Sequence, residues 1–156
     1  MAYTHSELAD IEAIRQLKAR YFRTVDTFDL TGWLTCFTAD CRLKFDTEVT
    51  PRDRREAPFA TLEGHQGLVD FWNGNSSRVQ SVHHGHCPEI EIMSATEARG
   101  IWAMEDIVEF TDGTLHGYGH YHETYRKEEG EWRIATLHLT RIRLSQSRPA
   151  DFPDSR

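Results

Sequence analysis

The feature that most restricts the fold is a two-residue alternation of side chains that fills the second half of the chain. It begins near Gln80 and runs through residues 98–110, 116–127 and 132–144. Because successive side chains of a strand point to opposite faces of a sheet, this alternation predicts strands. Short polar segments at residues 111–114 and 128–131, each with one glycine, separate the last three runs, as in antiparallel hairpins. The sequence therefore predicts an antiparallel meander of four to six strands.

The first part of the chain has a helical period instead. Thr4 and Glu7 form a capping-box pattern, and apolar residues then recur every three or four positions to about Thr27. This pattern predicts one long amphipathic helix. In the segment that follows it, we expect a short helix at residues 31–38, a strand at 41–45, a polar loop at 46–58 and a second short helix at 65–72.

Length and composition indicate one soluble globular domain. The chain has 156 residues, of which 38% are hydrophobic and 28% are charged. We expect a single domain over residues 1–156, with its core at about 6–144 and a C-terminal arm at 145–156. Helices followed by strands predict an α+β class, in which a curved antiparallel sheet wraps around the N-terminal helices as a cone, an α+β barrel with one deep pocket.

Charge and hydropathy exclude several partners. The net charge of -7 argues against nucleic acid, which selects basic surfaces. No apolar run reaches the ~18 residues of a membrane helix, and the N-terminus lacks a signal-peptide pattern. The three cysteines have no paired spacing, so we expect reduced thiols in a cytoplasmic protein with no membrane partner.

Three of the nine histidines fall within four positions, at His83, His84 and His86. Histidine titrates near neutrality and can serve as a general base or a metal ligand. Strand alternation places His84 and His86 on one face and His83 on the other. His120 and His122 form another same-face pair, but no acidic ligand stands at a fixed spacing from either group. We therefore expect no metal site. The roles of His84, His86, His120 and His122 stay open.

Charged residues also interrupt two apolar strand faces. Asp106 shares the more apolar face of its strand with Trp102 and Met104, while Arg141 and Arg143 continue an apolar row of the last strand. A buried carboxylate without a partner would cost several kcal/mol. Arg141 is therefore the candidate partner of Asp106. The alternative, a strand end that emerges into solvent, stays open for both arginines.

Asp26 lies near the end of the first helix, five residues after Tyr21 and about 140° further round it. The two side chains could therefore flank one pocket mouth. An acidic residue in the last turn opposes the helix dipole, which favours a special role over a solvated helix end. Both interpretations of Asp26 stay open on the helix pattern alone.

A set of motifs spread over about residues 6–144 resembles a known family. They are Tyr21-x-x-x-x-Asp26, Trp33-Leu34-x-x-Phe37, Gly64-His65-Gln66-Gly67, His83-His84-x-x-x-Pro88-x-Ile90, Gly100-x-Trp102 and Gly130-x-Trp132-Arg133-Ile134. The chain resembles the nuclear-transport-factor-2-like superfamily, in its polyketide-cyclase-like, scytalone-dehydratase-like and bile-acid-7α-dehydratase-like branch. That superfamily hosts many chemistries, so the resemblance speaks to fold more than to reaction.

The resemblance implies a cofactor-independent lyase, a dehydratase in the first instance. His83 would be the general base and Asp26 its orienting carboxylate, and Tyr21 would assist the leaving hydroxyl. Arg141, positioned by Asp106, would stabilise the developing enolate or an anionic group of the substrate. Scytalone dehydratases differ at one of these positions, having a second histidine where this chain has Asp106.

The expected pocket suits a small hydrophobic cyclic substrate, whether alicyclic, aromatic or steroid-like. The residues expected to line it are Trp102, Met104, Phe110, Tyr118 and Tyr121. We leave open whether loop 46–60 acts as a lid over it. The resemblance also implies a homo-oligomer, a trimer or dimer, because the open face of the sheet needs covering.

Two alternatives remain at this stage. An isomerase or cyclase, ketosteroid-isomerase-like or polyketide-cyclase-like, would use the same base without expelling a group, and the mass of the product would distinguish it. A non-catalytic ligand-binding domain or small subunit would need no His83–Asp26 pair and would co-purify with a large partner.

Overall fold

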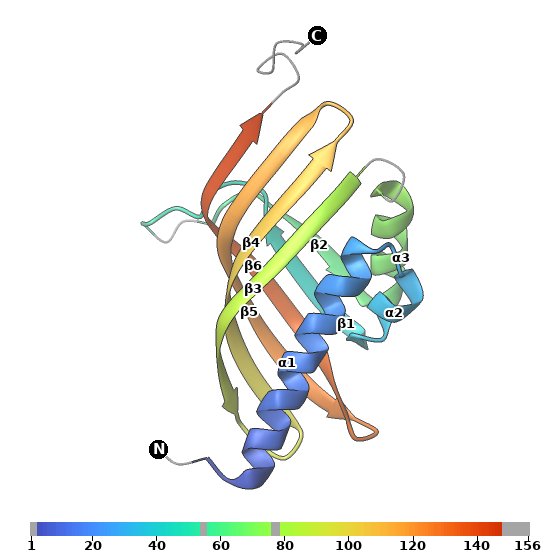
Figure 1. The fold of residues 1–156 in the computed structure, drawn as a ribbon, viewed down its shortest axis with the longest axis vertical. Coiled ribbons are helices and arrows are strands. Elements are labelled where there is room, and N and C mark those ends of the chain that lie inside the picture. Colours follow the sequence, from blue (N-terminus) through green and yellow to red (C-terminus); the bar gives the residue numbers. More distant parts are fainter. Residues whose placement is uncertain (1–2, 54–55, 76–78, 148–156) are drawn as a thin grey trace.

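The computed structural model describes residues 3–53, 56–75 and 79–147. Within these residues a six-stranded sheet curves around the first helix (Figure 1). The helices are α1 (His5–Asp26), α2 (Leu30–Leu34) and α3 (Gly64–Asn75). The strands are β1 (Phe37–Asp46), β2 (Phe59–Glu63), β3 (Val79–Ile92), β4 (Glu97–Phe110), β5 (Gly113–Glu128) and β6 (Glu131–Ser147). Of the helices described, none combines the length and hydrophobicity needed to cross a membrane.

The expected α+β cone is confirmed, with one difference in strand direction. The strand order is β2-β1-β6-β5-β4-β3, and β3 to β6 form the predicted antiparallel meander. β1 pairs with β2 antiparallel but with β6 in parallel, so the sheet is mixed. Parallel pairing needs a long connection between the two strands, and here most of the chain lies between β1 and β6. Alternation alone carries no information on that pairing.

α1 lies across the concave face of the sheet (Figure 1). Its capping box is present as predicted, because the Thr4 hydroxyl accepts from the Glu7 backbone N–H while the Glu7 carboxylate accepts from the Thr4 N–H. Ile14, Leu17 and Tyr21 are buried on the predicted face. The surprise on this face is Lys18, which is also fully buried.

Several predicted boundaries were wrong around β1. The second helix ends at Leu34, and β1 already begins at Phe37, within the stretch expected to be helical. Cys36, Phe37 and Thr38 are all buried in succession, which suits a strand covered on both faces rather than one face of a helix. β2 was missed because it is a short edge strand with mostly exposed side chains.

A register shift in β6 separates the two arginines of its apolar row. Gly119 of β5 pairs with Arg141, whereas the preceding Tyr118 pairs with Arg143, so Ile142 is an extra residue in β6. Such a bulge reverses the alternation beyond it. Arg141 is therefore buried on the inner face and Arg143 is exposed on the outer face. β6 also continues to Ser147, into the segment predicted to be the arm; residues 148–156 lie outside the described residues.

Candidate active site

Asp26, in the last turn of α1, contacts His83 of β3 through both carboxylate oxygens. The imidazole Nδ1 lies 2.6 Å from Oδ1, and the backbone N–H of His83 donates to Oδ2 at 2.8 Å. With Asp26 ionised, Nδ1 is the donor, which leaves Nε2 with the lone pair that a general base needs. The His83 and Asp26 side chains are 15% and 19% exposed, so the pair is partly open to solvent.

Ser81 is a third member of this group that sequence reasoning missed. Its hydroxyl donates to Asp26 Oδ1 at 2.9 Å, and the side chain is buried. Ser81 stands two residues before His83 and so shares its face of β3. The three donors together hold the carboxylate in one orientation. The available signal was this same-face spacing, which becomes meaningful only when α1 is known to lie against β3.

Asp106 and Arg141 form a buried, two-pronged ion pair on the same inner face. Arg141 Nη1 and Nη2 donate to the two Asp106 oxygens at 3.0 and 2.8 Å. Asp106 is the direct cross-strand partner of His83, so the Asp106 carboxylate and the imidazole lie side by side across β3 and β4. A side chain at Gly117 would collide with this pair, since an added Cβ would fall 1.9 Å from Arg141 Nη1 and 2.0 Å from Asp106 Oδ1.

The polar segment after β1 fixes Arg141 from the other side. Arg141 Nε donates to the Asp46 carbonyl at 3.1 Å, and its backbone N–H donates to the Thr50 hydroxyl at 2.9 Å. The Thr50 N–H in turn donates to the Arg141 carbonyl at 2.8 Å. This loop, of which residues 54–55 lie outside the described residues, thus supports the site rather than merely covering it.

Tyr21 and Tyr121, predicted to face the pocket, are both buried in the core. Tyr21 is 3% exposed and packs edge-on against Phe37 and Tyr121, with ring centroids 5.8 and 6.3 Å apart. Burial raises the pKa of both phenols well above their ordinary value, and nearby Glu123 adds to this for Tyr21. Both hydroxyls therefore stay protonated at neutral pH and can only donate or share a proton.

Lys18 belongs to a buried hydrogen-bond network that sequence reasoning missed. Its Nζ lies 2.5 Å from Glu123 Oε1, and the other carboxylate oxygen accepts from the Tyr125 hydroxyl at 2.5 Å. Trp102 Nε1 donates to the same hydroxyl at 2.8 Å. Burial lowers the pKa of Lys18, although Glu123 opposes this shift. The signal was a lysine at a helix position between Ile14 and Tyr21, where the apolar face requires a buried side chain.

Of the other residues predicted to line the pocket, Trp102 and Met104 are buried on the inner face. Two predictions were wrong. Phe110 is 43% exposed, because it is the last residue of β4 and lies beyond the helical cover. Tyr118 is on the outer face, where it pairs across strands with Glu105 and lies 5.8 Å from the Arg143 guanidinium. The glycines on either side of Tyr118, not the tyrosine, face inward there.

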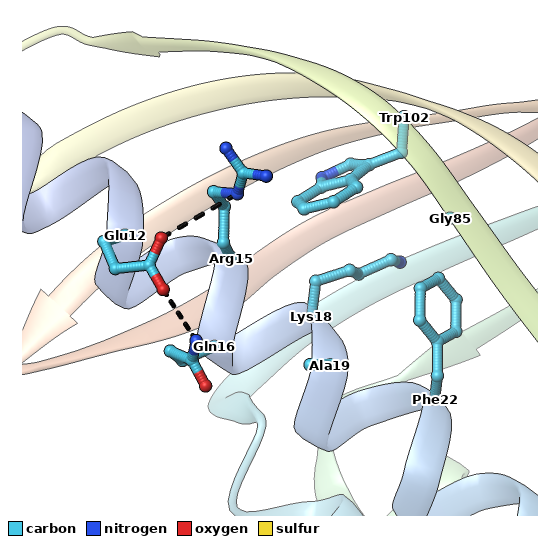
Figure 2. A pocket seen from close by; sticks show the side chains of 8 residues that line it. All are labelled: Glu12, Arg15, Gln16, Lys18, Ala19, Phe22, Gly85 and Trp102. Atoms are coloured by element: carbon cyan, nitrogen blue, oxygen red, sulfur yellow. Dashed lines mark hydrogen bonds and ion pairs between the residues drawn. The ribbon is translucent and has the colours of Figure 1, made fainter.

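Two hollows border the sheet, and neither is lined by Asp26 or His83 themselves. The smaller, of about 290 Å³, lies between α1 and strands β3 and β4, with Phe22 and Trp102 among its walls (Figure 2). The wider one lies at the N-terminal end of α1, where Tyr3 and Glu7 face strands β3 to β6, and none of the predicted site residues lines it. The expected single deep pocket around the dyad does not appear among these hollows.

Five other histidines lie on the outer face of the sheet. His84 and His86 stack with ring centroids 6.1 Å apart, and the rings of His120, His122 and His138 follow one another at 6.2 and 6.3 Å. Burial and the neighbouring imidazoles lower the pKa of His122. In the part of the chain that the structure describes, no three histidine, cysteine or acidic side chains are arranged to hold a metal ion.

Comparisons with known proteins identify the family of the chain. Residues 6–138 match the family described as the SnoaL-like domain. The structure is similar to an aspartate-to-asparagine variant of Rv3472, a protein of unknown function from Mycobacterium tuberculosis, with 26% identity, a TM-score of 0.75, and coverage of 92% of this chain and 78% of that one.

Two further structures show similarity of fold at lower identity. A scytalone dehydratase-like protein from Novosphingobium aromaticivorans is 19% identical, with a TM-score of 0.78 over 94% of this chain and 93% of the other. The hexachlorocyclohexane dehydrochlorinase LinA-type3 from Novosphingobium barchaimii is 18% identical, with a TM-score of 0.76 over 96% and 97% of the two chains. A shared fold at such identity leaves the reaction to be argued from the site.

Proposed function

The chain belongs to the SnoaL-like family of the nuclear-transport-factor-2-like superfamily, and from this premise we propose that it is a cofactor-independent lyase, a dehydratase of small cyclic substrates. The observation that carries the proposal is the Asp26–His83 contact at 2.6 Å on a partly exposed inner face. A carboxylate on Nδ1 orients an imidazole and stabilises its protonated form, as general base catalysis requires.

In the proposed reaction His83 Nε2 removes a proton from a carbon next to a carbonyl or within an activated ring. Negative charge then develops on the substrate and needs a fixed cation. Arg141 supplies it: three of its five N–H groups are held by Asp106 and the Asp46 carbonyl, and the others remain to donate. A guanidinium fixed in this way needs no reorganisation during the reaction.

Loss of the hydroxyl group completes the proposed elimination. Tyr21 is the proposed hydrogen-bond donor to the leaving oxygen, because its phenol is protonated at neutral pH; burial raises its pKa, so its proton is held until negative charge develops on that oxygen. Its burial means that the leaving group must reach into the core between Tyr21 and Tyr121. The electron pair left by the proton becomes the new double bond as the carbon–oxygen bond breaks, and the leaving hydroxide takes the Tyr21 proton to depart as water. The proton held by His83 then returns to the Tyr21 oxygen, through solvent, and both groups regain their starting states.

The test is a turnover assay with a panel of hydroxylated cyclic ketones, read by the mass of the product. We expect wild-type protein to release a product lighter by one water. His83→Ala and Asp26→Asn should lose turnover by about 10²–10⁴-fold while circular dichroism stays unchanged. His84→Ala, on the outer face, is the matched control. Turnover retained by His83→Ala would refute the assignment, and a product of unchanged mass would indicate an isomerase.

A further inference from the structure

The hollow between α1 and the sheet has the form of a ring-binding pocket. Its two aromatic walls are Trp102 from β4 and Phe22 from α1, and Lys18 passes between them (Figure 2). Ala19 is the small residue on the helical side, and Gly85 is its counterpart on β3. The two aromatic rings and the two small residues border one hollow of about 290 Å³, called the slot below.

Both walls are held in place by contacts outside the hollow. The Trp102 indole N–H donates to the Tyr125 hydroxyl, which is bound in turn to Glu123. Phe22 lies so close to Gly85 that an added Cβ would fall 2.6 Å from its Cε2 atom. Its ring is nearly parallel to the His83 imidazole, at 11° and 6.4 Å between centroids. The walls are therefore preorganised, which reduces the entropic cost of binding a ligand between them.

The floor and rim also suit an uncharged ring. The Lys18 ammonium is turned away to Glu123 and lies 3.7 Å from the Tyr121 ring centroid, so its charge is already balanced. At the mouth, the Glu12 carboxylate accepts from Gln16 at 2.6 Å and lies 3.9 Å from Arg15 Nε. These opposite charges give the mouth no net preference for ions. Apolar walls with a few polar groups at the edge are typical of small-molecule sites.

The hollow is adjacent to the dyad. Gly85 follows His83 by two residues on the same face of β3, which corresponds to about 7 Å along the strand. Phe22 lines the hollow, and its ring centroid lies 6.4 Å from that of the imidazole. A volume of about 290 Å³ accepts one or two fused rings and lies at the lower end of the range for ligand pockets.

We infer that this hollow is the subsite for the ring of the substrate, that it selects planar compounds of one or two fused rings, and that Phe22, which lines the hollow beside the base, determines this specificity. That the ligand is a substrate rests on the proposed lyase activity, whereas ring binding in the hollow does not. It narrows the substrate class by excluding four-ring steroids, which are too large for the slot.

The probe is 1-naphthol, followed through the indole N–H signal of Trp102 in ¹H–¹⁵N NMR, assigned with Trp102→Phe. The signal should shift saturably in wild-type protein. Ala19→Leu fills the slot from an exposed helix position and should weaken binding at least tenfold, whereas Ala13→Leu, on the same helix but outside the hollow, should bind as wild type. Gly85→Ala, which pushes Phe22 toward the hollow, should also weaken binding and serves as the second filling variant.

His83→Ala separates this inference from the proposed reaction. It should bind 1-naphthol within twofold of wild type while turnover is lost. If His83→Ala kept turnover but Ala19→Leu still blocked binding, the subsite would stand and the proposed reaction would fall. An unshifted Trp102 signal in wild type, or equal binding by Ala19→Leu and Ala13→Leu, would overturn the subsite. Displacement of 1-naphthol by the steroid androstenedione would overturn its size limit.

Discussion

Asp26 binds His83 at two points, the imidazole Nδ1 at 2.6 Å and the backbone N–H at 2.8 Å. The backbone contact fixes the position of β3 against the end of α1, and the side-chain contact fixes the ring. This double contact explains an acidic residue in the last turn of a helix, where the dipole alone disfavours it. Ser81 also donates to the carboxylate, so three hydrogen bonds stabilise its charge against the unfavourable helix dipole.

The tautomer of His83 should depend on Asp26. In wild-type protein the proton should lie on Nδ1, because Asp26 Oδ1 accepts it. Asp26→Asn can present either an acceptor or an amide donor to the ring, so the preference should be lost and both tautomers should appear. ¹⁵N NMR of histidine-labelled protein distinguishes them. A variant in which Nδ1 stays fully protonated would show that Asp26 does not set the tautomer.

Ser81→Ala should have a smaller effect than Asp26→Asn. It removes one hydrogen bond to the carboxylate at 2.9 Å and leaves the two His83 contacts intact. A single hydrogen bond to a charged group contributes about 1.5–3 kcal/mol at most, and part of it is replaced by water. We expect kcat to fall about 3–30-fold, with Ser94→Ala, in the exposed turn after β3, as the control. A loss as large as that of Asp26→Asn would mean that Ser81 does more than position the carboxylate.

The Asp106–Arg141 pair should show the asymmetry of buried ion pairs. Arg141→Met leaves the Asp106 carboxylate buried without its two donors and should lower the free energy of unfolding by about 3–5 kcal/mol. The double variant Arg141→Met/Asp106→Leu should recover most of that loss, because no buried charge remains. Urea unfolding of the single and double variants measures both values. A double variant as unstable as the single one would contradict the pairing.

Alkaline pH should destabilise the fold through its buried tyrosines. Burial raises the pKa of Tyr21, Tyr121 and Tyr125 above the value of 10.0 that each has in the unfolded chain. Above about pH 10 the folded state therefore holds more protons, and each tyrosine should lower the free energy of unfolding by about 1.4 kcal/mol per pH unit. Lys18 changes the free energy of unfolding in the opposite direction, because its pKa is lowered in the folded state. Its effect no longer increases above about pH 10.5, where the lysine of the unfolded chain has also lost its proton.

The measurement is urea unfolding at a series of pH values above 10, with tyrosinate absorbance in parallel. The three buried phenols should ionise only as the protein unfolds. Tyr21→Phe should reduce the slope of stability against pH by about 1.4 kcal/mol per pH unit, because one buried phenol is removed. Reversible ionisation of all tyrosines in the folded protein would contradict their burial.

The sequence predicted the fold through its strongest periodicities. The capping box at Thr4, the long alternating strands and the glycine-containing turns depend on local chemistry, and each was found in place. The parallel β1–β6 pair and the short strand β2 were missed, because long-range pairing and exposed edge strands leave little local pattern. The extra residue at Ile142 also has no sequence signal, although it decides which arginine faces inward.

The candidate site was predictable where a charge interrupts an apolar row. Asp106 and Arg141 were paired on that argument, and the structure joins them. The contact between Asp26 and His83 required the resemblance, because helix geometry alone cannot say which strand lies beside α1. Lys18 and Glu123 interrupt apolar rows in the same way but were overlooked. Phe110 failed because it ends β4 and is exposed, and Tyr118 failed because, three residues from the inward-facing Tyr121, it alternates to the outer face.

The most direct test of the central claim is proton abstraction by His83, which precedes both elimination and isomerisation. The measurement is the rate at which 2-tetralone, a two-ring ketone, takes up deuterium next to its carbonyl in D₂O. Wild-type protein should accelerate this exchange, and His83→Ala should reduce the acceleration by about 10²–10⁴-fold while His84→Ala leaves it unchanged. Equal exchange by wild type and His83→Ala would contradict the account.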